Sequence, residues 1–246
     1  MPNRLIILSG PSCVGKSPLD RALATFYPEH KQRLKTLVLY NSRVARPGEV
    51  DGRDYHFRKR SEIESLRTED RYVVMEVRGD LQALDLEQLK NDLEESDVFF
   101  EGNPFIGSLL LTHESLENIG KLSMFMSPLS REELQFYQKA EWNVSIPDLV
   151  TDIMRRKLLR RTKKQKTQLS LKDYENIERR AASAYSELEK GHLFDHVIPN
   201  HDGEDSEHWE AFFFPVGDAR RSLLAFVDLL EGKPPGWVEK WEEELL

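Results

Sequence analysis

The feature that most restricts the fold of this chain is an eight-residue segment near its N-terminus. It reads Gly10-Pro11-Ser12-Cys13-Val14-Gly15-Lys16-Ser17 and matches the pattern G-x-x-x-x-G-K-[ST] at every fixed position. An apolar run at residues 4–8 precedes it, and residues 19–26 carry apolar side chains at helical spacing. In such a strand–loop–helix unit, backbone N–H groups at the helix N-terminus enclose an anion. The segment therefore predicts a phosphate-binding loop.

The residue types of this loop predict ATP as its ligand, with residues Gly10 to Ser17 around the phosphates. Lys16 would reach the β- and γ-phosphates, and the Ser17 hydroxyl would bind Mg²⁺. Pro18 has no backbone N–H, so ATP binding should be weakened by about 1.5–3 kcal/mol, the value of one charge-assisted hydrogen bond. We interpret Cys13 as a small filler residue, against the alternative of a redox-sensitive thiol whose pKa is lowered by the helix N-terminus.

The remainder of the chain predicts an α/β fold. Strand-like runs alternate with helical patterns over 246 residues, and a hydrophobic content of 39% suffices for one substantial core. We expect a parallel sheet covered on both faces by helices. Further strands are predicted at 36–40, 72–77, 98–100, 122–126 and 194–199, and further helices at 61–66, 84–95, 147–162, 171–190 and 218–230. Residues 127–150 and 203–217 fit no simple element and are interpreted as insertions.

Charge and cysteine content exclude several classes of protein. The net charge of −8 disfavours a protein that binds duplex nucleic acid. A single cysteine cannot form an internal disulfide, and no targeting segment or membrane span is visible, so the sequence predicts a cytoplasmic protein. The seven histidines show no metal-binding spacing. The oligomeric state stays open.

A second informative stretch is the arginine-rich loop at residues 42–57. Its side chains Arg43, Arg46 and Tyr55 can converge on one dianionic phosphate, while Glu49 holds an arginine in place. Taken alone, the loop fits a solvated basic hairpin equally well.

Together the two motifs resemble the guanylate kinase family. G-P-S-x-V-G-K-S is followed by S-R-x-x-R-P-G-E-x-D-G-x-x-Y-x-F, and a thinner resemblance extends over roughly residues 4–202. It implies a P-loop NTPase-type three-layer αβα fold with a parallel core sheet, a lobe that binds the nucleoside monophosphate (NMP) and a helical lid. The implied reaction is ATP + GMP = ADP + GDP with Mg²⁺. The single domain 1–246 would divide into a core (1–38, 85–150 and 190–232), an NMP-binding lobe (about 39–84), a lid (about 155–182) and an acidic tail (233–246).

The same resemblance implies roles for individual residues. The GMP phosphate would be bound by Arg43, Arg46 and Tyr55, with Glu49 in support, and the guanine base by Glu76. Asn200 would lie beside the adenine of ATP, and Glu101 near the metal ion with Ser17. The residues implied in catalysis are Lys16, Arg43, Arg160, Arg161 and Arg180.

Two departures from the family pattern leave the acceptor base open. Leu39 replaces a base-reading serine, and residues 79–84, G-D-L-Q-A-L, replace G-N-Y-Y-G-[ST]. This loses a phosphate-binding tyrosine and a second base-reading hydroxyl, so altered base specificity is a hypothesis beside GMP. One alternative is a non-catalytic module that binds phosphopeptides or proteins, which would have no use for the intact Gly15-Lys16-Ser17. Another is a P-loop kinase acting on a different phosphorylated small molecule, which would leave Glu76 without a purpose.

Overall fold

The computed structural model describes residues 2–46 and 48–246, so Pro47 of the arginine-rich loop lies outside it. The central layer is a five-stranded sheet in the order β2-β7-β1-β8-β9, and every neighbouring pair is parallel. Its strands are β2 (Leu34–Thr36), β7 (Asp97–Gly102), β1 (Leu5–Ser9), β8 (Lys121–Ser127) and β9 (His196–Pro199). Such strands are apolar throughout because helices cover both faces. The predicted α/β fold with a parallel core sheet is confirmed.

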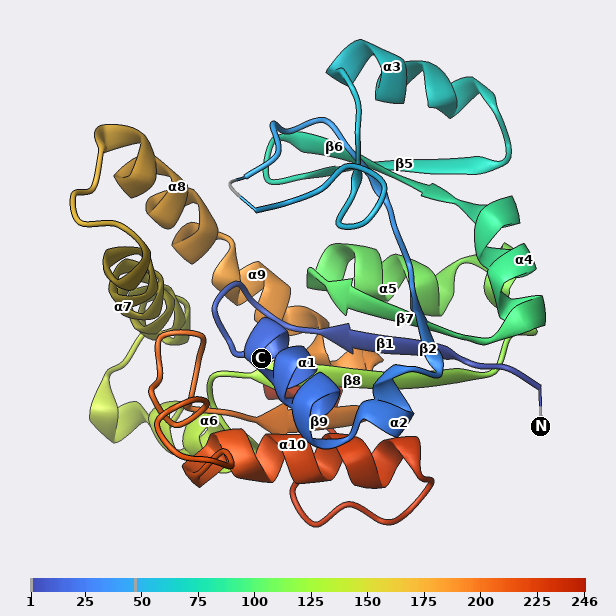
Figure 1. The fold of residues 1–246 in the computed structure, drawn as a ribbon. Coiled ribbons are helices and arrows are strands. Elements are labelled where there is room, and N and C mark those ends of the chain that lie inside the picture. The colour runs from blue at the N-terminus through green and yellow to red at the C-terminus, as the bar shows by residue number, and fades with distance from the viewer. Residues whose placement is uncertain (1, 47) are drawn as a thin grey trace.

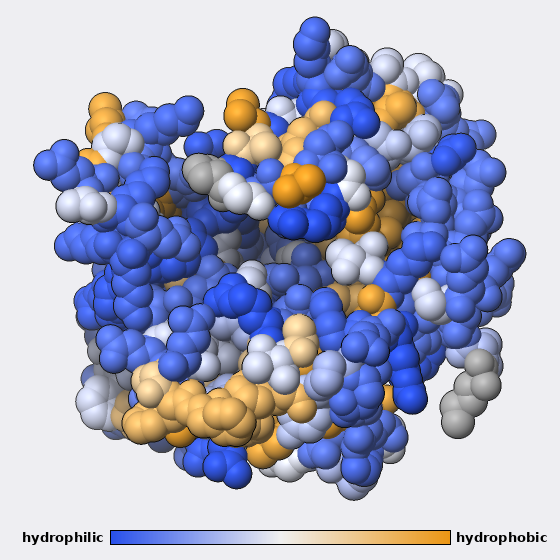
Figure 2. Space-filling model, viewed as in Figure 1, coloured by the Kyte–Doolittle hydropathy of each residue, from blue (hydrophilic) through white to orange (hydrophobic). Residues whose placement is uncertain are grey.

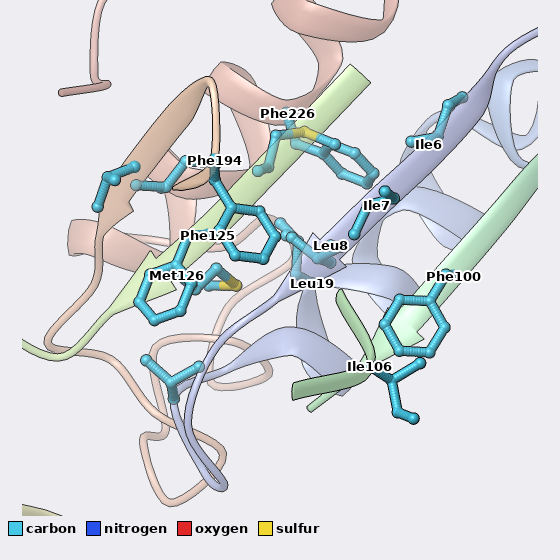
Figure 3. Close-up of a cluster of buried hydrophobic side chains, with 14 of the residues drawn as sticks. Ile6, Ile7, Leu8, Leu19, Phe100, Ile106, Phe125, Met126, Phe194 and Phe226 are labelled. Atoms are coloured by element: carbon cyan, nitrogen blue, oxygen red, sulfur yellow. The ribbon is translucent and has the colours of Figure 1, made fainter. Parts of the chain in front are cut away.

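Helices cover both faces of this sheet (Figure 1). On one face lie α1 (Lys16–Phe26) and α10 (Gly217–Leu230), where the rings of Phe99 and Phe226 are 6.0 Å apart. On the other lies α5 (Pro104–Thr112), where a Cβ at Gly107 would come within 2.2 Å of Ser9 Oγ. Figure 3 shows the buried side chains between these layers. The remaining short elements of the core are α2 (Pro28–Lys31), α4 (Leu86–Glu95) and the 3₁₀ turn η2 (Glu114–Leu116).

A second, smaller sheet has the order β4-β3-β6-β5. Its strands are β3 (Tyr40–Asn41), β4 (His56–Phe57), β5 (Tyr72–Val77) and β6 (Asp80–Asp85). The helix α3 (Arg60–Ser65) and the 3₁₀ turn η1 (Leu66–Thr68) follow β4, and Ile63 of α3 packs on Leu81 and Ala83. The opposite face, with Leu84 and Val77, belongs to the main core.

The structure corrects several predicted elements around this sheet. The predicted strand 36–40 is divided, because Thr36 ends β2 in the large sheet and Tyr40 begins β3 in the small one. The strand β6 was missed. The helix predicted at 84–95 begins only at Leu86, because the Asp85 side chain accepts a hydrogen bond from Gln88 N–H (3.0 Å) and caps it.

A helical pair stands at one side of the two sheets (Figure 1). It consists of α7 (Ile146–Gln165) and α8 (Leu171–Ala182). The predicted helix 171–190 is interrupted at Ser183, whose hydroxyl donates to the Glu187 carboxylate (2.8 Å). It continues as α9 (Ala184–Leu188) and the 3₁₀ turn η4 (Glu189–Leu193). In the described part of the chain, no helix is both long and apolar enough to cross a membrane.

The segments interpreted as insertions have definite places. Residues 127–150 contain α6 (Arg131–Tyr137) and the 3₁₀ turn η3 (Ala140–Trp142). Residues 203–216 form a loop without regular structure, whose Trp209 is buried, and Gly217 already begins α10. The C-terminal segment packs on the core: Glu239 bridges to Val197 of β9, Trp241 is buried, and the 3₁₀ turn η5 (Glu243–Leu245) ends it.

Candidate active site

The predicted phosphate-binding loop joins β1 to α1, and its two glycines have conformations that other residues rarely adopt. Gly10 has φ +148°, and a Cβ there would come within 2.4 Å of the Met126 carbonyl oxygen. Gly15 has φ +115° and caps α1. A Cβ there would come within 2.5 Å of Asn200 Nδ2. Close packing therefore requires glycine at both positions.

Lys16 and Ser17 begin α1 directly after this turn. The buried Lys16 ammonium donates to the carbonyls of Gly10 (2.7 Å) and Pro11 (2.9 Å), and burial lowers its pKa. Pro18 fits as the third residue of the helix, where it has no intrahelical partner to lose.

The Ser17 hydroxyl lies beside a carboxylate of the neighbouring strand. It donates to Glu101 Oε1 at 3.0 Å. Glu101 stands opposite Leu8 in the parallel register and therefore reaches the same end of the sheet as the loop. Burial raises the pKa of Glu101, although Lys16 opposes the change. A hydroxyl and a carboxylate this close are ligands of the kind that Mg²⁺ takes while keeping waters and substrate phosphates in its other positions. The pair fits the predicted metal site.

Cys13 is buried inside the loop with φ +71°. Burial raises the pKa of its thiol to about 12. This is opposite to the lowering that a redox-sensitive thiol would need, and it agrees with a filler residue.

The chain that follows β9 braces the phosphate-binding loop from outside. Asn200 is fully buried, and its amide donates to the carbonyls of Val14 (2.8 Å) and Asp202 (2.7 Å). The Trp209 indole N–H donates to the Asp202 carbonyl at 2.8 Å. In this structure the Asn200 amide therefore supports the loop, whereas the family resemblance assigned it to the adenine.

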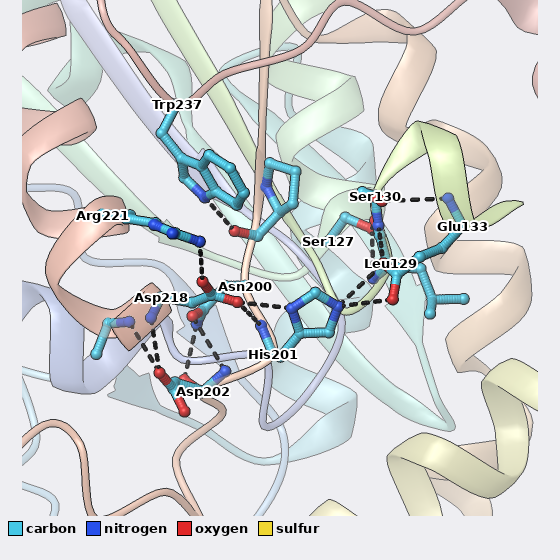
Figure 4. A network of polar contacts seen from close by, with 12 residues as sticks. Ser127, Leu129, Ser130, Glu133, Asn200, His201, Asp202, Asp218, Arg221 and Trp237 are labelled. Carbon is cyan, nitrogen blue, oxygen red and sulfur yellow. Dashed lines mark hydrogen bonds and ion pairs between the residues drawn. The ribbon is translucent and has the colours of Figure 1, made fainter. Parts of the chain in front are cut away.

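Next to Asn200 lies an ion network centred on His201 (Figure 4). Its Nδ1 lies 2.6 Å from Asp218 and its Nε2 lies 2.9 Å from Glu133, so the imidazole joins α6 to α10. Hydrogen bonds that the imidazolium donates to both carboxylates, Glu133 first, raise the pKa of His201 to about 9. This network holds the chain that follows Asn200 against α6 and α10.

A carboxylate that the sequence analysis missed lies at the phosphate-binding loop. Glu204 donates its N–H to the Cys13 carbonyl (3.2 Å), and its carboxylate accepts from Arg161 Nη1 of α7 (2.6 Å). Burial opposes ionisation, but Arg161 and Lys16 hold the pKa of Glu204 below its usual range. Glu204 is thus a negative charge beside Lys16 and Arg161, two cations that were predicted to bind phosphates. The acidic residues of this loop, as possible partners for the basic run 155–166, were the signal in the sequence that could have identified Glu204.

The other arginines predicted for the lid differ in their surroundings. Arg160 is exposed and donates to Asp205 at 2.7 Å. Arg180 of α8 has no ion-pair partner among the residues that the structure describes. Burial, together with Arg46 and Arg161 nearby, lowers its pKa to about 9. An arginine with so low a pKa marks a concentration of positive charge that an anion would stabilise.

The arginine-rich loop adds further positive charge to that of Arg161 and Arg180. Arg43 forms two hydrogen bonds of 2.6 Å with the Glu49 carboxylate, which also accepts from Arg46 N–H at 2.7 Å. The Arg43 guanidinium lies 5.1 Å from the Tyr55 ring centroid. Partial desolvation and then Arg43 and Arg161 lower the pKa of Arg46. Burial raises the pKa of Tyr55, and Glu101 adds to this. The arginine-rich loop is therefore close enough to Arg161 of α7 and to Glu101 of the large sheet for their charges to affect the pKa values of Arg46 and Tyr55.

Figure 2 shows the hollow on this face of the molecule, bordered by mainly hydrophilic residues. Among the residues predicted for the site, Glu76 has different surroundings. By alternation along β5, Glu76 lies on the α3 face, whereas Met75 lies on the opposite face. Its carboxylate accepts from Arg60 Nη2 at 2.9 Å and is more than half exposed. The structure therefore places the predicted guanine-binding carboxylate in an ion pair with α3.

The fold and this site define a P-loop nucleotide-binding α/β protein. The family model described as guanylate kinase matches residues 2–80. A guanylate kinase from Rhodococcus jostii is 30% identical over 234 residues, covering 94% of this chain and 88% of the relative. One from Nitratidesulfovibrio vulgaris is 31% identical over 232 residues, covering 93% of this chain and 95% of the relative. The chain belongs to the guanylate kinase family, which confirms the resemblance.

Among solved structures, the guanylate kinase from Anaplasma phagocytophilum aligns with 81% of this chain and 78% of its own at 19% identity, with a TM-score of 0.47.

Proposed function

We propose that this protein is an ATP-dependent nucleoside monophosphate kinase that converts ATP and GMP to ADP and GDP. The observation that carries the proposal is the proximity of Arg46, Arg161 and Arg180. They come from the arginine-rich loop, α7 and α8, yet in addition to burial, Arg46 and Arg161 both lower the pKa of Arg180, and Arg161 lowers that of Arg46. This proximity supports two phosphate sites that face one cleft. We retain the cytoplasm as the expected compartment, on the evidence of the single cysteine.

On this proposal about residues 39–84, which hold nearly all of the small sheet, are the acceptor lobe, and about residues 155–182, which hold the second half of α7 and all of α8, are the lid. Backbone N–H groups of the loop and Lys16 hold the triphosphate of ATP. Ser17 and Glu101 would hold Mg²⁺, which supplies charge neutralisation at the phosphates when bound.

At the acceptor side, Arg43, Arg46 and Tyr55 hold the phosphate of GMP, and Glu49 fixes the Arg43 fork. An oxygen of that phosphate attacks the γ-phosphorus of ATP in line, and the bond from this phosphorus to the bridging oxygen of ADP breaks. The chain's contribution is to align the two nucleotides and to surround the transferring group with Lys16, Arg161 and Arg180. Arg160, bound to Asp205 at the exposed edge, would join them on lid closure.

Neither alternative is favoured. A module that only binds phosphopeptides needs the Arg43 clamp but has no use for a buried Lys16 or for a Ser17–Glu101 pair. A kinase for another phosphorylated small molecule is not supported by relatives named guanylate kinase.

The test is a coupled assay of ADP release with GMP, dGMP, AMP, CMP and UMP as acceptors. Lys16→Ala should lower the rate by at least about 100-fold, because Lys16 stabilises charge on the transferring phosphoryl. The matched control is Lys35→Ala, since Lys35 is an exposed residue of β2 that pairs with Asp92 of α4 and belongs to neither phosphate-binding motif. Full activity of Lys16→Ala, or no acceptor turned over by the wild-type protein, would refute the proposal.

A further inference from the structure

One buried side chain that the proposed mechanism does not use is Gln82 of β6. It is 6% exposed, and its Oε1 is buried without a hydrogen-bond partner among the described residues. Buried polar atoms are nearly always paired, since an unpaired one costs free energy. A buried amide oxygen without a partner, close to the acceptor-phosphate clamp, therefore points to a ligand that supplies the missing donor.

Gln82 belongs to a row of side chains across the small sheet. The register pairs Phe57 with Asn41, Asn41 with Gln82, and Gln82 with Met75. Alternation puts this row on the same face as Leu84, which is turned toward the main core and away from α3. Two neighbouring buried amides, flanked by an aromatic ring and a thioether, thus lie side by side on this face.

This row is continuous with the acceptor-phosphate clamp. Arg43 N–H donates to Asn41 Oδ1 at 3.1 Å, and the Arg43 guanidinium lies 5.3 Å from the Phe57 ring centroid. A phosphate on Arg43 therefore brings the rest of the acceptor toward the amides.

The row leads at its far end into a cavity. Met75 lines this cavity of about 330 Å³ together with Phe105 and Ser108 of α5. The Ser108 hydroxyl oxygen is a second buried atom without a partner among the described residues. The volume and the apolar walls suit a planar base. Glu76 also borders the cavity, but its carboxylate is held by Arg60.

An amide and a carboxylate offer different hydrogen-bond donors and acceptors, and therefore pair with different bases. A carboxylate offers two acceptors, which match the adjacent N–H donors of guanine. An amide offers one acceptor beside one donor, which match an amino group beside a bare ring nitrogen, as in adenine and cytosine. We propose that Gln82 hydrogen-bonds the acceptor base and extends the range of acceptors from GMP to AMP and CMP. This inference rests on the proposed kinase function.

The experiment measures kcat and KM for GMP, AMP and CMP, and binding of the same acceptors and of ribose 5-phosphate by calorimetry. Gln82→Met, which keeps the volume and removes the amide, should raise KM and Kd for AMP and CMP at least tenfold and leave the KM for ATP unchanged. Gln82→Glu should shift the ratio of kcat/KM for GMP over AMP at least tenfold toward GMP. Ribose 5-phosphate should bind equally to all variants. Gln88→Met on the exposed side of α4 is the matched control.

Three results obtained with an active kinase would overturn the inference. Gln82→Met could leave the acceptor KM and Kd unchanged, or it could weaken ribose 5-phosphate as much as AMP, which would make Gln82 a contact of the sugar or the phosphate. Glu76→Gln could raise the KM for GMP where Gln82→Met does not, which would assign base reading to the carboxylate. Failure of the kinase function has a different signature, since wild-type protein would then turn over no acceptor. Calorimetry would still decide the role of Gln82: AMP binding lost in Gln82→Met supports it, and no binding to the wild-type protein overturns it.

Discussion

Replacing Glu204 with glutamine should destabilise the unliganded protein and strengthen ATP binding. Glu204 and Arg161 form a 2.6 Å hydrogen bond, and their side chains are only 17% and 18% exposed. A hydrogen bond between charged groups contributes about 1.5–3 kcal/mol. Glu204→Gln should lower the free energy of unfolding by this amount, because Lys16 and Arg161 would face each other without the intervening carboxylate.

Although Glu204→Gln should lower the stability of the protein, it should strengthen the binding of ATP. Glu204 should repel the phosphates of a nucleotide bound to the same loop. For comparison, two unit charges 4 Å apart interact by about 4 kcal/mol at an effective dielectric constant of 20. Relief of only about 1.4 kcal/mol of this repulsion gives tenfold tighter binding. Calorimetry of MgATP measures this binding, and urea denaturation measures stability. Glu210→Gln is the matched control on the same loop, since Glu210 pairs with Arg21 at the surface. Weaker ATP binding by Glu204→Gln would refute the reasoning and make Glu204 a support for Arg161.

Two further predictions concern the loop that braces the site. Gly15→Ala should abolish ATP binding measured by calorimetry, because its Cβ would come within 2.5 Å of Asn200 Nδ2 at a φ of +115°; retained affinity would contradict the packing. His201 has a folded pKa of about 9 against an unfolded value of 6.5, so its ion pairs stabilise the protein fully below pH 6.5 and lose this contribution as pH rises through 9. Because its side chain is 48% exposed, solvent screening reduces the expected loss to about 1 kcal/mol, measurable by urea denaturation at pH 6 and pH 10. His201→Gln should show no such loss, and an equal loss in the variant would exclude His201 as its source.

Local motifs predicted the parts of the fold that local chemistry determines. The glycine pattern at residues 10–17 identified the loop because its two glycines need backbone conformations and close contacts that other residues do not allow. The apolar runs identified β1, β7 and β8 because parallel strands are buried on both faces. The acidic partner of Arg43 was found because Glu49 lies only six residues away in the same loop.

Features that depend on contacts distant in the sequence were not predicted. Residues 79–84 showed no clear strand pattern because Gln82 is buried although it is polar, so β6 was missed. The position of Glu76 depends on strand alternation and on Arg60 of α3, sixteen residues earlier. Glu204 meets Arg161 from a loop that no periodicity describes. Each of these is decided by tertiary pairing, which composition and spacing do not specify.

The most direct test of the two-site cleft is calorimetry with a bisubstrate ligand in which adenosine and guanosine are joined by five phosphates. If the phosphate-binding loop and the arginine-rich loop face each other, this ligand should bind at least tenfold more tightly than ATP or GMP alone. Lys16→Ala and Arg43→Ala should each remove that advantage. Affinity no greater than that of ATP, unaffected by Arg43→Ala, would show that the two loops do not share a cleft.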